Sequence, residues 1–370
     1  MPEAALQVLI PTSRSLVAGL PPAVRAAHRA AADLPGARIV LCGGEAVARR
    51  YPRQLDAVKA VCANGEPAAS VLDPDKPLVV VGPDGFPQPE ALKAFVSRAA
   101  AEGRPARWTC GGRTAAAYFP RAGAVVTPAE DSAALAARAL REPASSEAQG
   151  WVPAADAAEG KTAERALFAA LPKDTDGYIA KLDRKLSIAI SAVLLKLPVT
   201  PNDITTASLV LGLLGAYWLA SGSYSWTLAG AFLLWFCCLL DGCDGEVARL
   251  KLLCSPSGAA YDLWADHVAH LATFVAIPIA VHRAFPQASF KIPGVLLVTG
   301  FLACMFSVWY LVLRKPESER GPYGLLIERV ASRDYVYLIA ALALVGHLDW
   351  FLYAAGVGSH LFWAALWLVA

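Results

Sequence analysis

The composition of this chain changes sharply near its middle. Long apolar runs dominate from about Leu186 to Ala370, whereas charged residues, prolines and alanines fill roughly the first half. With 56% hydrophobic and only 17% charged residues, the 370-residue chain is too apolar for one soluble domain. The sequence therefore predicts a soluble N-terminal domain followed by a membrane domain.

The first half alternates short apolar runs with alanine-rich stretches. The runs expected to form buried strands are residues 7–11, 37–42, 77–82 and 122–127. The stretches expected to form helices include residues 22–33 and 88–102. This alternation predicts an α/β domain with a mostly parallel sheet. We expect this domain to span residues 1–145, a small and polar linker 146–173, and the membrane domain 174–370.

Two features of the first half invite a comparison with ligand sites. Gly43 and Gly44 follow a predicted strand, but a phosphate-binding fingerprint needs G-x-G-x-x-G, so a plain turn is favoured. Asp84 lies between Pro83 and Gly85, which favours a turn residue over a metal ligand. The eight cysteines show neither a disulfide framework nor a zinc spacing, so we expect them to be reduced.

The second half predicts an all-α domain of six transmembrane helices. The expected spans are about 203–220, 225–250, 258–282, 292–313, 334–347 and 350–370. Because the last two spans nearly touch, five spans or a re-entrant pair are alternatives. Residues 176–187 are basic and amphipathic, which predicts a preceding helix that lies on the membrane surface.

Basic residues predict the orientation of the domain in the lipid bilayer. The loops on the side of the N-terminal domain carry Arg314, Lys315, Arg320, Arg329 and Arg333. The opposite side has little beyond Arg283 and Lys291. The positive-inside rule then places the N-terminal domain in the cytoplasm. No block of lysine and arginine is long enough to predict a nucleic-acid partner.

Four aspartates form the strongest signal in the sequence. Asp241 and Asp244 are i,i+3 neighbours, and Asp262 and Asp266 are i,i+4 neighbours on the next predicted helix. The connection between these helices is short, so they are expected to be antiparallel partners. The four carboxylates should then converge near the cytoplasmic face, where only cations could neutralise them.

Oxygen ligands of this kind predict a hard metal ion. Mg²⁺ is the expected ion and Mn²⁺ its alternative, with two ions about 3.5–4 Å apart able to clamp a phosphoryl displacement. Gly245, Ala248 and Gly258 allow close approach of a backbone or a flat ligand. Arg249 could bind a phosphate through two N–H groups.

The pattern D-x2-D-G-x2-A-R-x8-G-x3-D-x3-D, from Asp241 to Asp266, resembles the signature of the CDP-alcohol phosphotransferase family. The resemblance covers about residues 176–370. Residues 200–205 resemble the family's Pro-Asn-x-x-Thr entry, and residues 240–251 are similar to the di-myo-inositol-phosphate-phosphate synthase branch. In that branch a cytidylyltransferase is often fused to the membrane domain. Here the segment after the first strand lacks the Gly-rich basic loop, so the N-terminal domain looks like a degenerate nucleotidyltransferase.

The resemblance implies roles for individual residues. Asp241, Asp244 and Asp262 would hold the metals, with Asp266 as the general base and a further candidate ligand. The implied contacts to the CDP-linked donor are Asn202, Thr205, Gly245, Ala248, Arg249, Ser255 and Gly258. The donor would be CDP-diacylglycerol or a CDP-polyol, and transfer of its phosphate group to an alcohol would release CMP.

The acceptor is predicted from charge alone. Basic residues near the metal site would suit an alcohol that already carries a phosphate, such as an inositol phosphate; the candidates are Arg314, Arg320, Arg329 and Arg333. Ordinary topology-setting charge is the alternative for each of them.

For the whole chain, a divalent-cation transporter and a non-catalytic scaffold are alternatives to the enzyme. Close helix packing makes a homodimer plausible.

Overall fold

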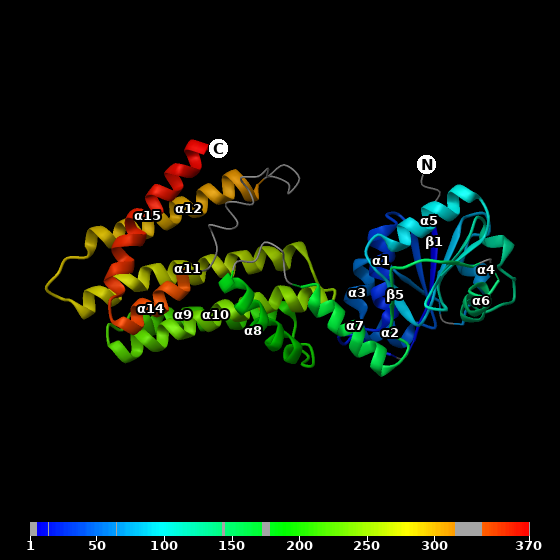
Figure 1. Ribbon diagram of the computed structural model, residues 1–370, viewed down its shortest axis with the longest axis horizontal. Helices are drawn as coiled ribbons and strands as arrows, with labels where there is room; N and C mark the ends of the chain where they lie inside the picture. The colour runs from blue at the N-terminus through cyan, green and yellow to red at the C-terminus, as the bar shows by residue number, and fades with distance from the viewer. Residues whose placement is uncertain are drawn as a thin grey trace. The chain divides into compact units, whose positions relative to one another are not determined.

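The computed structural model describes residues 6–13, 15–63, 65–142, 145–171, 178–314 and 335–369. The chain divides into two compact units (Figure 1). The first comprises Met1–Leu171 together with Leu250–Leu253, and the second comprises Pro172–Arg249 and Cys254–Ala370.

The first unit is built on a seven-stranded sheet in the order β3-β2-β1-β4-β7-β6-β8. Its strands are β1 (Gln7–Pro11), β2 (Arg38–Cys42), β3 (Val61–Ala63), β4 (Leu78–Val81), β6 (Ala106–Cys110), β7 (Arg113–Phe119) and β8 (Ser145–Glu147). Four of its six strand pairs are parallel, and β7 runs antiparallel to both β4 and β6. The predicted α/β class with a mostly parallel sheet is confirmed.

Both faces of this sheet are covered by helices (Figure 1). Val8 and Ile10 of β1 pack in one core with α1 (Pro22–Asp33) and α5 (Ala91–Glu102). Leu9 points the other way, into a core shared with α6 (Ser132–Ala139) and α4 (Ala68–Val71). Because successive side chains of a strand alternate between faces, a strand buried on both faces must be apolar throughout. This explains the uninterrupted apolar run at residues 8–10 within β1.

The turn predictions for the first unit agree with its structure. Gly43 has a φ of 65° in the turn before the short helix α2 (Glu45–Arg50), which α3 (Pro52–Ala57) follows. Asp84 lies in the turn before β5 (Gly85–Pro87). All eight cysteines are free, as expected.

One expectation for the first half was wrong. Residues 122–127 are not a strand, because a 3₁₀ turn (Ala122–Ala124) replaces it. The backbone N–H groups of Ala122 and Gly123 donate to the carbonyls of Lys76 and Pro74, and this holds the segment across the end of the sheet. Within the expected linker 146–173, β9 (Trp151–Pro153) pairs with β5, and helix α7 (Ala157–Ala169) follows.

The described part of the second unit is helical. Its elements are α8 (Tyr178–Leu194), α9 (Pro201–Leu219), α10 (Tyr224–Leu250), α11 (Pro256–Ala284), α12 (Lys291–Val308), a π-helical turn (Trp309–Leu313), α14 (Tyr335–Val345) and α15 (Leu348–Val369). Among the described residues, four helices are long and apolar enough to cross a bilayer: those at 224–250, 256–284, 291–311 and 348–368. They indicate an integral membrane domain. The predicted count of six spans is not confirmed, since α9 and the shorter α14 fall outside this set.

Local sequence fixes where α9 and α11, two helices of the site described below, begin. Thr200 caps α9 by accepting the N–H of Asp203, whose carboxylate accepts the N–H of Thr200 in return. Ser255 caps α11 by accepting the N–H of Gly258 at 3.0 Å. A proline occupies the first turn of both helices, where its missing N–H costs nothing. The polar starts of α9 and α11 are thereby set by their own residues.

Candidate metal centre

Two aspartates of the site lie on α10 near its C-terminal end. Asp241 and Asp244 are one helical turn apart, and both are buried, with 7% and 4% of their surface exposed. On another face of the same helix, Cys243 and Val247 pack with Ile204 of α9. The C-terminal part of α10 thus buries acidic and apolar side chains next to one another within the helical unit.

Asp262 of α11 completes a group of three carboxylates. One oxygen from each of Asp241, Asp244 and Asp262 lies within 4.8 Å of the others. Oδ1 of Asp262 is buried and has no hydrogen-bond partner among the described residues. Three converging acids with an unsatisfied buried oxygen suit a hard divalent cation such as Mg²⁺, which is bound through carboxylates. The residues present therefore fit the metal predicted from the sequence.

Asp266 lies one turn beyond Asp262 on α11 and is not part of this group of three, in a search confined to the described residues. Its Oδ1 lies 3.7 Å from Nε2 of His270, another turn along the same helix. The structure thus separates the four predicted acids into a cluster of three and a fourth acid that faces an imidazole.

Thr205 of α9 contacts the acidic cluster directly. Its hydroxyl donates a hydrogen bond to the carboxylate of Asp244, and both side chains are buried. The family resemblance implies that Thr205 contacts the donor, and the structure shows its hydroxyl bonded to one of the three clustered acids. A hydroxyl in this position restricts the rotamer of Asp244.

Two glycines of the signature have polar side chains packed closely against them. A Cβ placed on Gly258 would lie 2.9 Å from Oγ of Ser255 and 3.4 Å from Oδ1 of Asn202, so these three predicted donor contacts lie together. A Cβ on Gly245 would lie 3.4 Å from Nη1 of Arg249, so the guanidinium folds back over that glycine. Ala248 is half-buried on the same helix.

A buried glutamate that the sequence analysis did not single out lies within the signature. Glu246 is completely buried and accepts hydrogen bonds from Ser187 at 2.6 Å and Ser191 at 2.7 Å. Arg184 donates to it at 3.0 Å. All three partners lie on α8. Two features of the sequence could have indicated this network. One is an acidic residue within an apolar helix, and the other is a pair of serines spaced i,i+4 on the amphipathic helix α8.

The predicted acceptor residues are mostly outside the described part of the chain. Arg320, Arg329 and Arg333 lie in the range 315–334, which the structure does not describe. Arg314 is exposed, and its guanidinium lies 5.8 Å from the ring centroid of Tyr310. The Arg314 side chain therefore makes a cation–π contact at the end of the π-helical turn.

Residues 198–369 match the model of the CDP-alcohol phosphatidyltransferase family. The C-terminal domain of this chain belongs to that family. The matched range contains α9, α10 and α11, and with them all four aspartates of the signature. The family resemblance predicted from these residues is confirmed.

Similar curated proteins come from archaea and bacteria, and each is named bifunctional IPC transferase and DIPP synthase. The Archaeoglobus fulgidus protein is 34% identical over 151 residues, which cover 40% of this chain and 30% of the relative. The Rubrobacter xylanophilus protein is 37% identical over 112 residues, covering 29% and 24%. The Thermococcus kodakarensis protein is 36% identical over 115 residues, covering 30% and 26%. The matches thus span less than a third of each relative's length.

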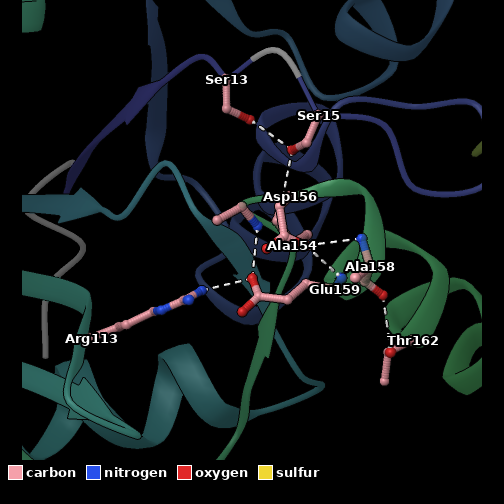
Figure 2. Close-up of polar contacts among 9 residues, drawn as sticks. Ser13, Ser15, Arg113, Ala154, Asp156, Ala158, Glu159 and Thr162 are labelled. Carbon is pink, nitrogen blue, oxygen red and sulfur yellow. Dashed lines mark hydrogen bonds and ion pairs between the residues drawn. The ribbon is translucent and has the colours of Figure 1, made fainter.

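The N-terminal unit has its own polar cluster at the end of β1, which Figure 2 shows. Oγ of Ser15 donates to the carbonyl of Ala154 at 2.5 Å and lies 3.3 Å from Oγ of Ser13. Arg113 donates to Glu159 of α7 at 2.6 Å, and this guanidinium lowers the pKa of the Glu159 carboxyl. The segment that leads into α7 is therefore bonded to the loop after β1.

Proposed function

We propose that this protein transfers a substituted phosphate group from a CDP-linked donor to an alcohol and releases CMP. The observation that carries the proposal is the group of three carboxylates within 4.8 Å in a domain of the CDP-alcohol phosphatidyltransferase family. An inositol phosphate is our proposed acceptor, and CDP-diacylglycerol or CDP-inositol is the proposed donor. The names of the similar proteins and the branch-like residues 240–251 support this choice.

The proposed role of Asp241, Asp244 and Asp262 is to hold divalent metal ions. Such ions would reduce the negative charge of the donor diphosphate and make CMP a better leaving group. Thr205 would keep the carboxylate of Asp244 oriented toward them through its hydrogen bond. The Asn202, Ser255 and Gly258 group lies at the starts of α9 and α11, where it would contact the cytidine side of the donor.

Asp266 is the proposed general base. It would take the proton of the acceptor hydroxyl as the acceptor oxygen forms its bond to the phosphorus distal to cytidine. The bond between that phosphorus and the bridging oxygen breaks, and CMP leaves with the electron pair. His270 lies beside Asp266 and would orient its carboxylate. A base of this kind contributes roughly 10²–10⁴-fold to the rate.

The Asp266→Asn variant tests this assignment. Asparagine has nearly the same shape but cannot accept the proton, so we expect CMP release to fall by at least about 10²-fold while donor binding is retained. Purified full-length protein would be incubated with Mg²⁺, inositol phosphate and either CDP-diacylglycerol or CDP-inositol. The measurement is CMP and the mass of the product, with EDTA as the metal-free arm.

Asp349→Asn is the matched control, because Asp349 lies at the start of α15 and contacts His347 rather than the cluster. It should leave CMP release unchanged. Normal CMP release by Asp266→Asn would show that the base is another residue. Absence of turnover in the wild-type protein with every donor and acceptor would instead favour a cation transporter or a scaffold.

A further inference from the structure

A groove lies between α11 and α12. It is close to residues 285–290, which join the C-terminal end of α11 to the N-terminal end of α12. Its volume is 710 Å³, within the range of about 300–1,000 Å³ typical of ligand pockets. Val275 and Ile279 line it from α11, and Val295 and Val298 line it from α12. Each pair is spaced by one helical turn, so each helix gives the groove a continuous apolar wall.

A close helix contact forms the floor of this groove. A Cβ placed on Gly294 would lie 2.9 Å from Cβ of Pro278, so the backbone of α12 packs directly against the proline ring of α11. Val275, Ile279 and Val295 flank the contact and are exposed, with 41%, 39% and 62% of their surfaces accessible. In a bilayer these surfaces face hydrocarbon, which makes a lipid chain the natural material to fill the groove.

Basic residues lie at one end of the groove. His282 and Arg283 are in the last turn of α11, and Lys291 is the first residue of α12. None of the described residues that line the groove is acidic. Nη1 of Arg283 donates to the carbonyl of Ala220 at 2.7 Å, which fixes that guanidinium in place. The ammonium of Lys291 adds a second positive charge.

The length of the groove is close to half the thickness of the hydrocarbon core of a bilayer. From Lys291 to Thr299, the lining residues at its two ends, α12 rises roughly 12 Å. Half of the hydrocarbon core measures about 15 Å. A lipid whose headgroup lies at Lys291 would therefore place most of one acyl chain along the groove. Arginine and lysine bind phosphate oxygens through charge-assisted hydrogen bonds, so an acidic headgroup at this end of the groove would find two partners.

We propose that this groove is a binding site for an anionic phospholipid. One acyl chain lies against the four apolar residues of the wall, and the headgroup phosphate contacts Lys291 and Arg283. From Asp262 of the acidic cluster to Val275, the lining residue of α11 nearest to it in sequence, the helix rises roughly 20 Å, so the site is distinct from the cluster. The proposal does not depend on the reaction that the cluster performs.

Native mass spectrometry of the purified full-length protein tests the proposal. The probes are dioleoyl phosphatidylglycerol and dioleoyl phosphatidylcholine, which share their chains and differ in headgroup charge. We expect the wild-type protein to prefer phosphatidylglycerol. Lys291→Gln should reduce that preference by about fivefold, because a basic residue near the lipid surface has an effect of that size. Val295→Trp fills the groove and should weaken binding of both lipids.

Two variants serve as matched controls. Lys196→Gln removes a positive charge from the segment between α8 and α9, and Ile292→Trp enlarges an exposed residue that does not line the groove. Both should bind the lipids as the wild-type protein does. An equal loss in Lys196→Gln and Lys291→Gln would overturn the proposal. So would a Val295→Trp protein that loses a dimer but keeps its lipid, since the groove would then be a subunit contact.

Discussion

The buried carboxylate of Glu246 accepts its hydrogen bonds from side chains of another helix. Its bonds to Arg184, Ser187 and Ser191 attach α8 to the helix that carries Asp241 and Asp244. Removing one partner of a buried ion pair is costly because the other charge is left without compensation. We therefore infer that this network fixes the position of α8 on α10.

Replacement of Glu246 by glutamine should reveal this coupling. Each single variant, Glu246→Gln and Arg184→Gln, should reduce the free energy of unfolding by about 1–3 kcal/mol, since each removes one charge from a hydrogen-bonded ion pair and leaves the other uncompensated. The double variant should lose less than the sum of the two, because the second change no longer breaks an ion pair. Thermal unfolding of the purified protein in one detergent measures all three. Additive losses would show that the two side chains act independently.

The packing of α9 on its neighbours depends on glycine. A Cβ placed on Gly212 would lie 3.0 Å from both Cβ of Ala269 and Sγ of Cys237, which belong to α11 and α10. These three helices carry Thr205 and the clustered aspartates. Their close approach therefore determines whether the hydroxyl of Thr205 can reach Asp244.

A larger residue at Gly212 should separate these helices. Gly212→Leu is expected to destabilise the protein by about 1–3 kcal/mol, the usual cost of overpacking. Gly358→Leu is the matched control, because a Cβ at that helical position would meet no atom within 4 Å. The control should be neutral or slightly stabilising, since leucine favours helix more than glycine does. Thermal unfolding compares the two, and equal melting temperatures would contradict a tight contact at Gly212.

Helical spacing made part of the site predictable from sequence. Asp241, Asp244 and Asp262 come together because each pair of signature acids follows the period of a helix and the connection between the helices is short. The residue types of the Glu246 network are visible in the sequence, but their pairing could not be predicted, since α9 separates α8 from α10 along the chain. Long-range contacts also limited the prediction of secondary structure. The Val125–Val126 pair predicted a strand, but distant backbone carbonyls hold that segment in a turn.

The N-terminal unit has the layered sheet expected of a nucleotidyltransferase, and we propose that it has lost that chemistry. The loop after β1 has no Gly-rich basic sequence, and Ser15 is bonded to the carbonyl of Ala154. A Cβ placed on Gly160 of α7 would lie 3.0 Å from the carbonyl oxygen of Leu16, so this helix packs closely against the same loop. The segment before α7 thus occupies the edge where a nucleotide would be expected to bind.

The full-length protein should consequently be unable to make its own CDP-linked donor. With CTP, inositol phosphate and Mg²⁺, we expect no pyrophosphate above the level of a protein-free blank, because the loop offers no cradle of backbone N–H groups for the triphosphate. The same preparation must release CMP when CDP-inositol or CDP-diacylglycerol is supplied, which shows that it is folded. Pyrophosphate release that EDTA abolishes would demonstrate a working cytidylyltransferase. The donor would then be made and used by one chain, and the contacts of Ser15 would have to open during turnover.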